Sequence, residues 1–487
     1  MKLKPLRWLS LVLVTVALVL FTSQSVNAAT AQHYTELEFP PLKEIEFPDY
    51  DRFTLDNGMV VYLVEDHELP LIHGNALVKT GARLEPADQI GLAGITGTVM
   101  RSGGTQEHSP NEVNQLLEQR AASVETGISD TVGTASFESL TEDVETVFRL
   151  FAEVIQQPSF DPQKLALAKK QTASGIARRN DDPNDIAARE FYKLVYGETS
   201  PYARTVEYTT LENITREDVV QFYRQSFRPD QMILGIAGDF DPAEMKTLIQ
   251  EVFEDWQPEA VDSLPEKPEV STQNRQTGVF FVEQPQLTQS YINMGHLGGE
   301  LKNPDYPALS VVNGVLNGFG GRLFNEVRSR QGLAYSVYGY WSPNYDYPGV
   351  FIAGGQTRSD ATVPFVQSVK QEIQQLQTQP ITPEKLSYAK ESILNSFVFN
   401  FQTPSQMISR LMRYEYYDYP ADYIFQYQQG IKDTTIADVQ RVAQTYLNPE
   451  DLTLLVVGNS EQIQPPLSQL DSDVKIVDIA IPSPSSS

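Results

Sequence analysis

The chain has 487 residues, of which 41% are hydrophobic and 21% are charged. This length exceeds what one hydrophobic core usually organises, so we expect two or three domains, and the composition excludes an intrinsically disordered chain. The formal net charge of −26 argues against nucleic acid and anionic lipid as partners, whereas basic peptide segments would be attracted. Because the chain has no cysteine, disulfides and thiolate metal sites are excluded as well.

The first 28 residues have the pattern of a secretory signal peptide. Three cationic residues precede an apolar run from Trp8 to Phe21, and a small-residue cleavage site ends at Ala28. The run of 14 residues is shorter than the about 20 that a membrane span needs, so we expect cleavage rather than an anchor, and no stable span afterwards. Export without disulfides fits the periplasm or another bacterial envelope compartment, or secretion.

The elements predicted next are strands and helices without a regular βαβ alternation. Residues 52–64 form a predicted hairpin around an Asp-Asn-Gly turn at 56–58. Ser109 is a predicted N-cap, because Pro and Glu follow it at the first and third helical positions. A strand over 131–139 should then precede a helix over 144–156. This mixture favours the α+β class.

The chain contains two copies of one unit. Residues 161–176 match residues 382–397 at an offset of 221, and residues 214–240 match residues 434–459 at an offset of 220. A period of this length indicates a duplicated domain and is too long for a solenoid repeat. The predicted organisation is a signal peptide (1–28), an extended arm (29–46), an N-terminal domain (47–255), a linker rich in Pro and charge (256–275), a C-terminal domain (276–465) and a tail (466–487).

Two motifs connect the repeat to a known family. The first copy has Gly-Leu-Ala at 91–93 and Gly-Gly-Thr at 103–105, and the second has GGRLFNEVRSRQGLAYSV at 320–337. Over roughly residues 47–462 the chain resembles the insulinase or pitrilysin family of zinc peptidases, which includes the mitochondrial processing peptidases. The resemblance implies two tandem homologous α+β domains, each a mixed sheet with packed helices, that form half of a clamshell.

Active members of that family carry H-x-x-E-H directly after the Gly-Leu-Ala and a third Glu ligand on a later helix. The two His hold zinc, and the Glu between them takes a proton from the bound water. By the resemblance, the His positions fall on Gly94 and Thr98, the Glu position on Gly97, the third ligand on Gly175 and a helper Glu on Ala168. None of these residues offers an imidazole or a carboxylate, so we expect this chain to bind no metal.

No other catalytic site emerges from the sequence. The five His are His33, His67, His73, His108 and His296, and no two of them are three or four residues apart, so a helical metal pair is excluded. His67 and His73 flank a predicted strand end and are interpreted either as a metal pair or as solvated loop residues. The chain has no G-x-S-x-G elbow, and the glycines of 316–322 lack the Lys-Ser/Thr of a phosphate loop.

The second copy retains a pair that the family uses. The resemblance implies that Arg328 and Tyr335 reach across an interior chamber to the substrate at the zinc site. Gly332 is predicted to end the helix that carries Arg328, and the tight turn after it would bring both tips together. Without the resemblance, Arg328 would be interpreted as complementing the helix C-terminus and Tyr335 as filling a core.

Loss of the ligands beside retention of this pair resembles the non-catalytic subunit of a heterodimeric peptidase in the cell envelope. The partner would be a homologous H-x-x-E-H subunit that holds the zinc, the substrate would be a peptide or unfolded protein, and the strands of 124–136 would be a candidate wall for it. The chain would then be inactive alone. Two alternatives are an inactive scaffold or binding protein of the same fold, and a stand-alone metallopeptidase with a rearranged metal site.

Overall fold

The computed structural model describes residues 47–257, 266–271 and 275–484. The predicted signal peptide, the extended arm and part of the predicted linker lie outside the described residues. All described residues belong to one compact unit, which begins at Glu46. Within the described part of the chain, no helix is both long and apolar enough to cross a bilayer.

A six-stranded mixed sheet, in the order β1-β2-β6-β3-β5-β4, organises the first half. The predicted hairpin is confirmed, because β1 and β2 pair antiparallel on either side of Gly58, whose φ of 93° is in the left-handed region. Strand β6, which lies within the repeated segment 214–240, runs parallel to β2 in the middle of the sheet. The strands are β1 (Asp51–Thr54), β2 (Val60–Glu65), β3 (Leu71–Val78), β4 (Ser123–Ile128), β5 (Gly133–Leu140) and β6 (Met232–Gly238).

Helices cover this sheet and connect its strands. Ser109 caps α3 in a full capping box with Glu112, as predicted, and the predicted helix over 144–156 is α4 with the same bounds. An Asp before a Pro begins α5, α6 and α9, because the Asp side chain accepts from the first free N–H groups. The helices are α2 (Leu92–Ser102), α3 (Pro110–Glu118), α4 (Val144–Gln156), α5 (Pro162–Arg178), α6 (Pro183–Tyr196), α7 (Tyr208–Asn213), α8 (Arg216–Ser226) and α9 (Pro242–Phe253).

The second half repeats this arrangement, which confirms the duplication. Its six-stranded sheet has the order β12-β7-β11-β8-β10-β9, and β11 runs parallel to β7 as β6 does to β2. The strands are β7 (Gly278–Glu283), β8 (Gln289–Leu297), β9 (Ala334–Ser342), β10 (Val350–Arg358), β11 (Thr453–Gly458) and β12 (Val474–Ile476). The helices are α10 (Tyr306–Leu316), η6 (Phe324–Arg330), α11 (Thr362–Thr378), α12 (Pro383–Phe397), α13 (Pro404–Tyr416), α14 (Tyr423–Asp433) and α15 (Ile436–Tyr446).

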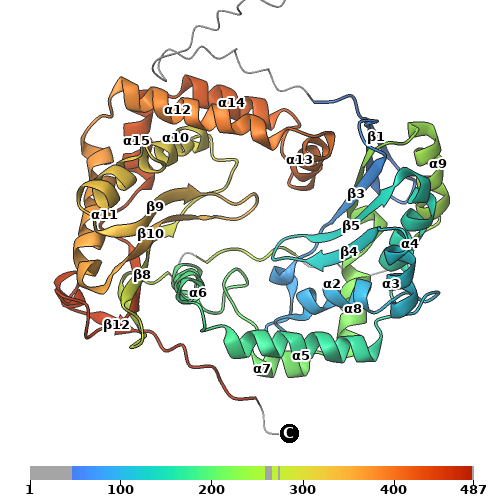
Figure 1. The fold of residues 1–487 in the computed structure, drawn as a ribbon, viewed down its shortest axis with the longest axis horizontal. Helices are drawn as coiled ribbons and strands as arrows, with labels where there is room; N and C mark the ends of the chain where they lie inside the picture. Colours follow the sequence, from blue (N-terminus) through green and yellow to red (C-terminus); the bar gives the residue numbers. More distant parts are fainter. Residues whose placement is uncertain (1–46, 258–265, 272–274, 485–487) are drawn as a thin grey trace, which may run out of the picture. The chain divides into compact units, whose positions relative to one another are not determined.

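Each half lends one helix to the sheet of the other half (Figure 1). Helix α6 packs against β8 and β11 of the second sheet, and α13 packs against β6, β2 and β3 of the first. Phe191 of α6 and Met412 of α13 are both fully buried in these contacts, and they stand 221 residues apart, at equivalent positions of the repeat. Met412 lies directly on a glycine: a Cβ added at Gly235 would be 2.2 Å from the Met412 Sδ. The exchange therefore joins the halves through packed apolar side chains.

The region predicted as a C-terminal tail also contributes to both halves. β12 pairs parallel with β7 at the edge of the second sheet. Asn180, which follows α5 in the first half, donates a hydrogen bond from Nδ2 to the carbonyl oxygen of Ile479 at 2.8 Å. Ile481 packs against the core of the first half.

Candidate functional site

Helix α2, which carries the degenerate motif, is capped at its N-terminus by an acidic side chain. Glu85 lies before it, and its carboxylate accepts hydrogen bonds from the N–H groups of Gly91 and Ala93 at 3.1 and 2.6 Å. This caps the helix, because a carboxylate at an N-terminus meets both the free donors and the positive end of the helix dipole. Burial raises the pKa of Glu85, while these two hydrogen bonds oppose that shift.

The three positions expected to carry zinc ligands are exposed but lack ligand atoms. Gly94 and Thr98 are one turn apart on the exposed side of α2, and the Thr98 hydroxyl donates to the Gly94 carbonyl oxygen at 2.9 Å. Gly175 is exposed on α5, and added Cβ atoms at Gly94 and Gly175 would meet nothing within 4 Å. Among the described residues, no group of three His, Asp or Glu side chains is placed to hold a metal. The residues present do not fit the zinc that such a helix carries in active relatives.

The position expected to carry the general base is closed by the protein itself. Gly97 is buried, and an added Cβ would lie 2.6 Å from the backbone nitrogen of Ile128 and 2.8 Å from the carbonyl carbon of Gly127. Thr126 fixes this approach, because its hydroxyl donates to the Gly97 carbonyl oxygen at 2.6 Å. Strand β4, the edge strand of the first sheet, therefore lies directly on α2 where a Glu would have to stand.

Alanine substitutions at Gly97 and Gly94 test whether the first position is closed by β4 and the second is open. We expect Gly97→Ala to lower the free energy of unfolding by about 2–3 kcal/mol, because β4 must shift to make room for the methyl group. Gly94→Ala, the matched control, should raise the free energy of unfolding by about 0.5–1 kcal/mol, because alanine is the better helix former at an exposed site. Urea unfolding followed by circular dichroism measures both, and equal stabilities would contradict the packing of β4 on α2.

Arg328 and Tyr335 lie together, as predicted. Segment η6 is a π-helix that closes with the hydrogen bond from the N–H of Gln331 to the Glu326 carbonyl oxygen, and Gly332 follows with a φ of 63°. This turn sends the chain back along β9, so that the Arg328 guanidinium lies 5.7 Å from the centroid of the Tyr335 ring.

Both side chains are exposed and their polar groups are free within the described part of the chain. Tyr335 is 75% exposed, which rules out the core-filling interpretation. The Arg328 guanidinium also lies 4.8 Å from the Phe324 ring, so two aromatic rings hold it by cation–π contacts. No carboxylate pairs with Arg328 and no acceptor pairs with the Tyr335 hydroxyl among the described residues, so each retains donors for a ligand.

The four histidines in the described part of the chain do not form a metal site. His67 lies between two carboxylates, with Nδ1 2.5 Å from Asp239 and Nε2 2.5 Å from Glu65. Since both ring nitrogens are engaged by carboxylates, the metal-pair interpretation does not hold for His67. It is an exposed, ion-paired residue of the loop between β2 and β3, which agrees with its interpretation as a solvated loop residue. His73 instead approaches Glu138 at 3.8 Å. The hydrogen bond to Asp239, followed by that to Glu65, raises the pKa of His67 above its ordinary value.

This contact predicts a pH dependence of stability. A raised pKa in the folded state means that the stabilisation is complete below the ordinary His pKa of about 6.5 and is lost as the pH rises through the folded value. The melting temperature of His67→Gln should therefore be below that of the unchanged chain at pH 5.5 and approach it at pH 9. Thermal melts across this range test the expectation, and a constant difference between the two proteins would contradict it.

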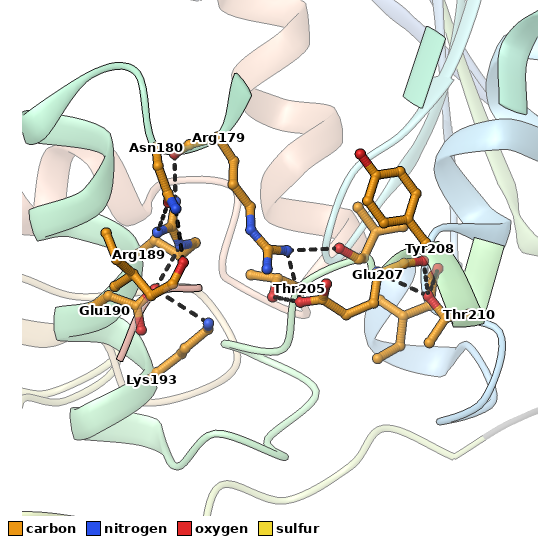
Figure 2. Close-up of polar contacts among 12 residues, drawn as sticks. Arg179, Asn180, Arg189, Glu190, Lys193, Thr205, Glu207, Tyr208 and Thr210 are labelled. Atoms are coloured by element: carbon orange, nitrogen blue, oxygen red, sulfur yellow. Dashed lines mark hydrogen bonds and ion pairs between the residues drawn. The ribbon is translucent and has the colours of Figure 1, made fainter. Parts of the chain in front are cut away.

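A charged network beside the degenerate site gave no signal in the sequence (Figure 2). Arg189 of α6 donates to the Arg179 carbonyl oxygen, to Asn180 and to Glu190, all within 2.8 Å. Glu190 is buried and also pairs with Lys193 at 3.3 Å. The network ties the end of α5, which carries Gly175, to the middle of the exchanged helix α6, and such pairings depend on tertiary contacts rather than on periodicity.

Comparisons with known proteins agree with this arrangement. The family model described as "Insulinase (Peptidase family M16)" matches residues 74–209, and the model described as "Peptidase M16 inactive domain" matches residues 213–393. Two solved structures share the fold. One is a peptidase M16 inactive domain from Pseudomonas fluorescens, with a TM-score of 0.74, 23% identity and coverage of 84% of this chain and 98% of that one. The other is the periplasmic protease PqqL from Escherichia coli, with a TM-score of 0.72, 16% identity and coverage of 87% and 48%.

The relatives with similar sequences include both a protein named as a peptidase and one named as a non-peptidase. The "Non-peptidase homolog YmxG" of Helicobacter pylori is 24% identical over 461 residues, which cover 92% of this chain and 99% of the relative. The "Uncharacterized zinc protease YmxG" of Bacillus subtilis is 24% identical over 363 residues, which cover 74% and 86%. With the two family models in tandem and a repeat that carries no zinc ligands, this chain belongs to the M16, or insulinase, family of peptidases as a homologue without the family's zinc motif.

Proposed function

We propose that the chain is the non-catalytic, substrate-binding subunit of a heterodimeric M16 peptidase. The observation that carries the proposal is the exposed pair of Arg328 and Tyr335, whose donors are free within the described residues. A π-helix and a left-handed glycine place the guanidinium 5.7 Å from the centroid of the Tyr335 ring. A chain that had lost all function at this surface would have no need to hold a cation between two rings with its donors outward.

The chemistry of the pair suits a peptide carbonyl. A guanidinium and a phenol both donate hydrogen bonds, and both can strengthen those bonds when the carbonyl oxygen gains negative charge during attack. In this proposal the partner subunit supplies H-x-x-E-H, and its zinc provides the activated water. Arg328 and Tyr335 bind and orient the carbonyl that is attacked.

The net charge of the chain and the edge strand of the first sheet together indicate a substrate class. An extended peptide can add to the edge strand β4, where its backbone is satisfied regardless of sequence, and the acidic chain attracts basic segments. We propose peptides and unfolded proteins as substrates. We also propose the bacterial periplasm or another envelope compartment as the location, supported by the signal pattern at the N-terminus and by the periplasmic location named for PqqL.

The test mixes this chain with an H-x-x-E-H homologue encoded in the same genome. Sedimentation should detect a one-to-one complex, and the complex should cleave an unstructured basic peptide at least tenfold faster than either chain alone. Variants of the homologue with its motif Glu changed to Gln control for contaminating peptidases. A complex without faster cleavage would favour the scaffold alternative, and absence of any complex would overturn the proposal.

A further inference from the structure

A cavity of about 710 Å³ lies where the two halves meet, and neither the degenerate-motif positions nor Arg328 belongs to its lining. In the first half it is bordered by the end of β3 and the start of the loop that precedes α2. In the second half it is bordered by the β9–β10 turn and the connection between α13 and α14. Its volume is within the range of pockets that hold small organic ligands. No part of the proposed peptidase function uses it.

Aromatic side chains form much of the wall. Six of them line the cavity, and Tyr345 stacks on Tyr417 with ring centroids 4.6 Å apart and planes at 10°. The hydroxyls of Tyr416, Tyr419 and Tyr423 all donate to backbone carbonyl oxygens. Because these hydroxyls are engaged by the protein, the rings are what the wall offers to a ligand, and ring faces favour another flat ring.

The charge of the lining is opposite to that of the chain. Four cationic side chains line the cavity against two acidic ones, whereas the whole chain has 37 Lys and Arg against 63 Asp and Glu. Lys79 is exposed, and its Nζ forms no hydrogen bond or ion pair with the described residues. Arg83 is partly buried, with a side chain 9% exposed, and is ion-paired with Asp346 at 2.8 Å; its Nε has no hydrogen-bond acceptor within the described part of the chain.

We propose that this cavity binds a small organic anion that carries an aromatic ring. The carboxylate of the ligand lies beside Lys79 and Arg83, and its ring packs on the tyrosines around Tyr417. Lys267 and Lys302 are engaged by the Asp346 carbonyl oxygen and by Glu300. An anion is favoured over a cation because Lys79 Nζ and Arg83 Nε remain as cationic donors in the lining, and a low-dielectric aromatic wall strengthens that attraction. Because the cavity exists only in the folded chain, binding of the ligand also raises the melting temperature.

Three matched probes test the ligand class on the purified full chain. Isothermal titration calorimetry should show saturable binding of N-acetyl-L-tyrosine. N-acetyl-L-tyrosine amide keeps the ring without the charge, and N-acetylglycine keeps the charge without the ring, so each should bind at least tenfold more weakly. No saturable binding of N-acetyl-L-tyrosine up to about 10 mM, or equal binding of its amide, would overturn the proposal.

Two variants test the location. Lys79→Gln should weaken binding of N-acetyl-L-tyrosine by about fivefold, the upper end for an exposed ion pair, and Tyr417→Leu by about tenfold. Lys170→Gln, at an exposed lysine on α5 outside the cavity, is the matched control and should bind as the unchanged chain does. Circular dichroism confirms that each variant is folded. Equal affinities of Lys79→Gln and Lys170→Gln would overturn the placement. None of these readouts needs peptidase activity, so failure here leaves the proposed function untouched.

Discussion

Replacing Arg328 by Ala, or Tyr335 by Phe, should lower the turnover of the paired peptidase by about 10²–10³, with a smaller effect on KM. The reason is that a donor aimed at the attacked carbonyl is worth more when negative charge develops on its oxygen than in the ground state. The Arg328 guanidinium lies 5.7 Å from the centroid of the Tyr335 ring, so the two side chains present their donors on the same surface.

The chain offers matched controls for both substitutions. Arg330, on the same π-helical segment, is exposed and pairs with Glu326, so Arg330→Ala removes a cation without touching the pair. Tyr340 lies further along β9 and stacks on Tyr338, so Tyr340→Phe removes a hydroxyl from the same strand. Steady-state rates are compared after sedimentation shows that all variants pair equally with the partner. If Arg328→Ala and Tyr335→Phe gave the same turnover as the unchanged chain, the two residues would have no catalytic role. If only KM changed, they would bind the substrate without stabilising the transition state.

Truncating the residues at the centre of the helix exchange should have the largest effects on stability. Phe191→Ala is expected to cost about 3–5 kcal/mol and Met412→Ala about 2–5 kcal/mol of the free energy of unfolding, because both side chains are fully buried between a helix of one half and the sheet of the other. Denaturant unfolding at equilibrium measures both losses. A loss below 1 kcal/mol in each would show that the exchange contributes little.

A double-mutant cycle isolates the contact between the halves. Gly235→Ala should cost about 1–3 kcal/mol, because its methyl group would collide with Met412, but much less in the Met412→Ala background, where that side chain is gone. Phe151 is equally buried but lies within the core of the first half, so Phe151→Ala and Gly235→Ala should be additive. Additivity of Gly235→Ala with Met412→Ala as well would contradict the contact.

Local signals in the sequence predicted the local structure. The Asp-Asn-Gly turn, the capping box at Ser109 and the repeat offset each depend on residues close in the chain or on direct comparison, and the structure has all of them. The pairing of Arg328 with Tyr335 was also predictable, since Gly332 fixes the turn between them.

Features that depend on distant segments escaped prediction. The packing of β4 against Gly97 could not be inferred from the sequence. A glycine at the position of the family's Glu shows that the carboxylate is missing, but not which segment of backbone fills the space. The exchange of α6 and α13 was equally hidden: an amphipathic helix shows that it has an apolar face but not which sheet will cover it. The strand β12 escaped because three residues give too short a pattern for a strand to be recognised.

The exchange of helices has a consequence for how the protein is made. The first sheet is complete once β6 has been synthesised, yet the face that α13 covers stays bare until the ribosome reaches residue 416. During that interval an apolar surface that includes Tyr62, Leu77 and Ile233 has no cover and is open to misassembly. Productive folding of the first half is therefore expected to be completed only when the whole of α13 has been synthesised.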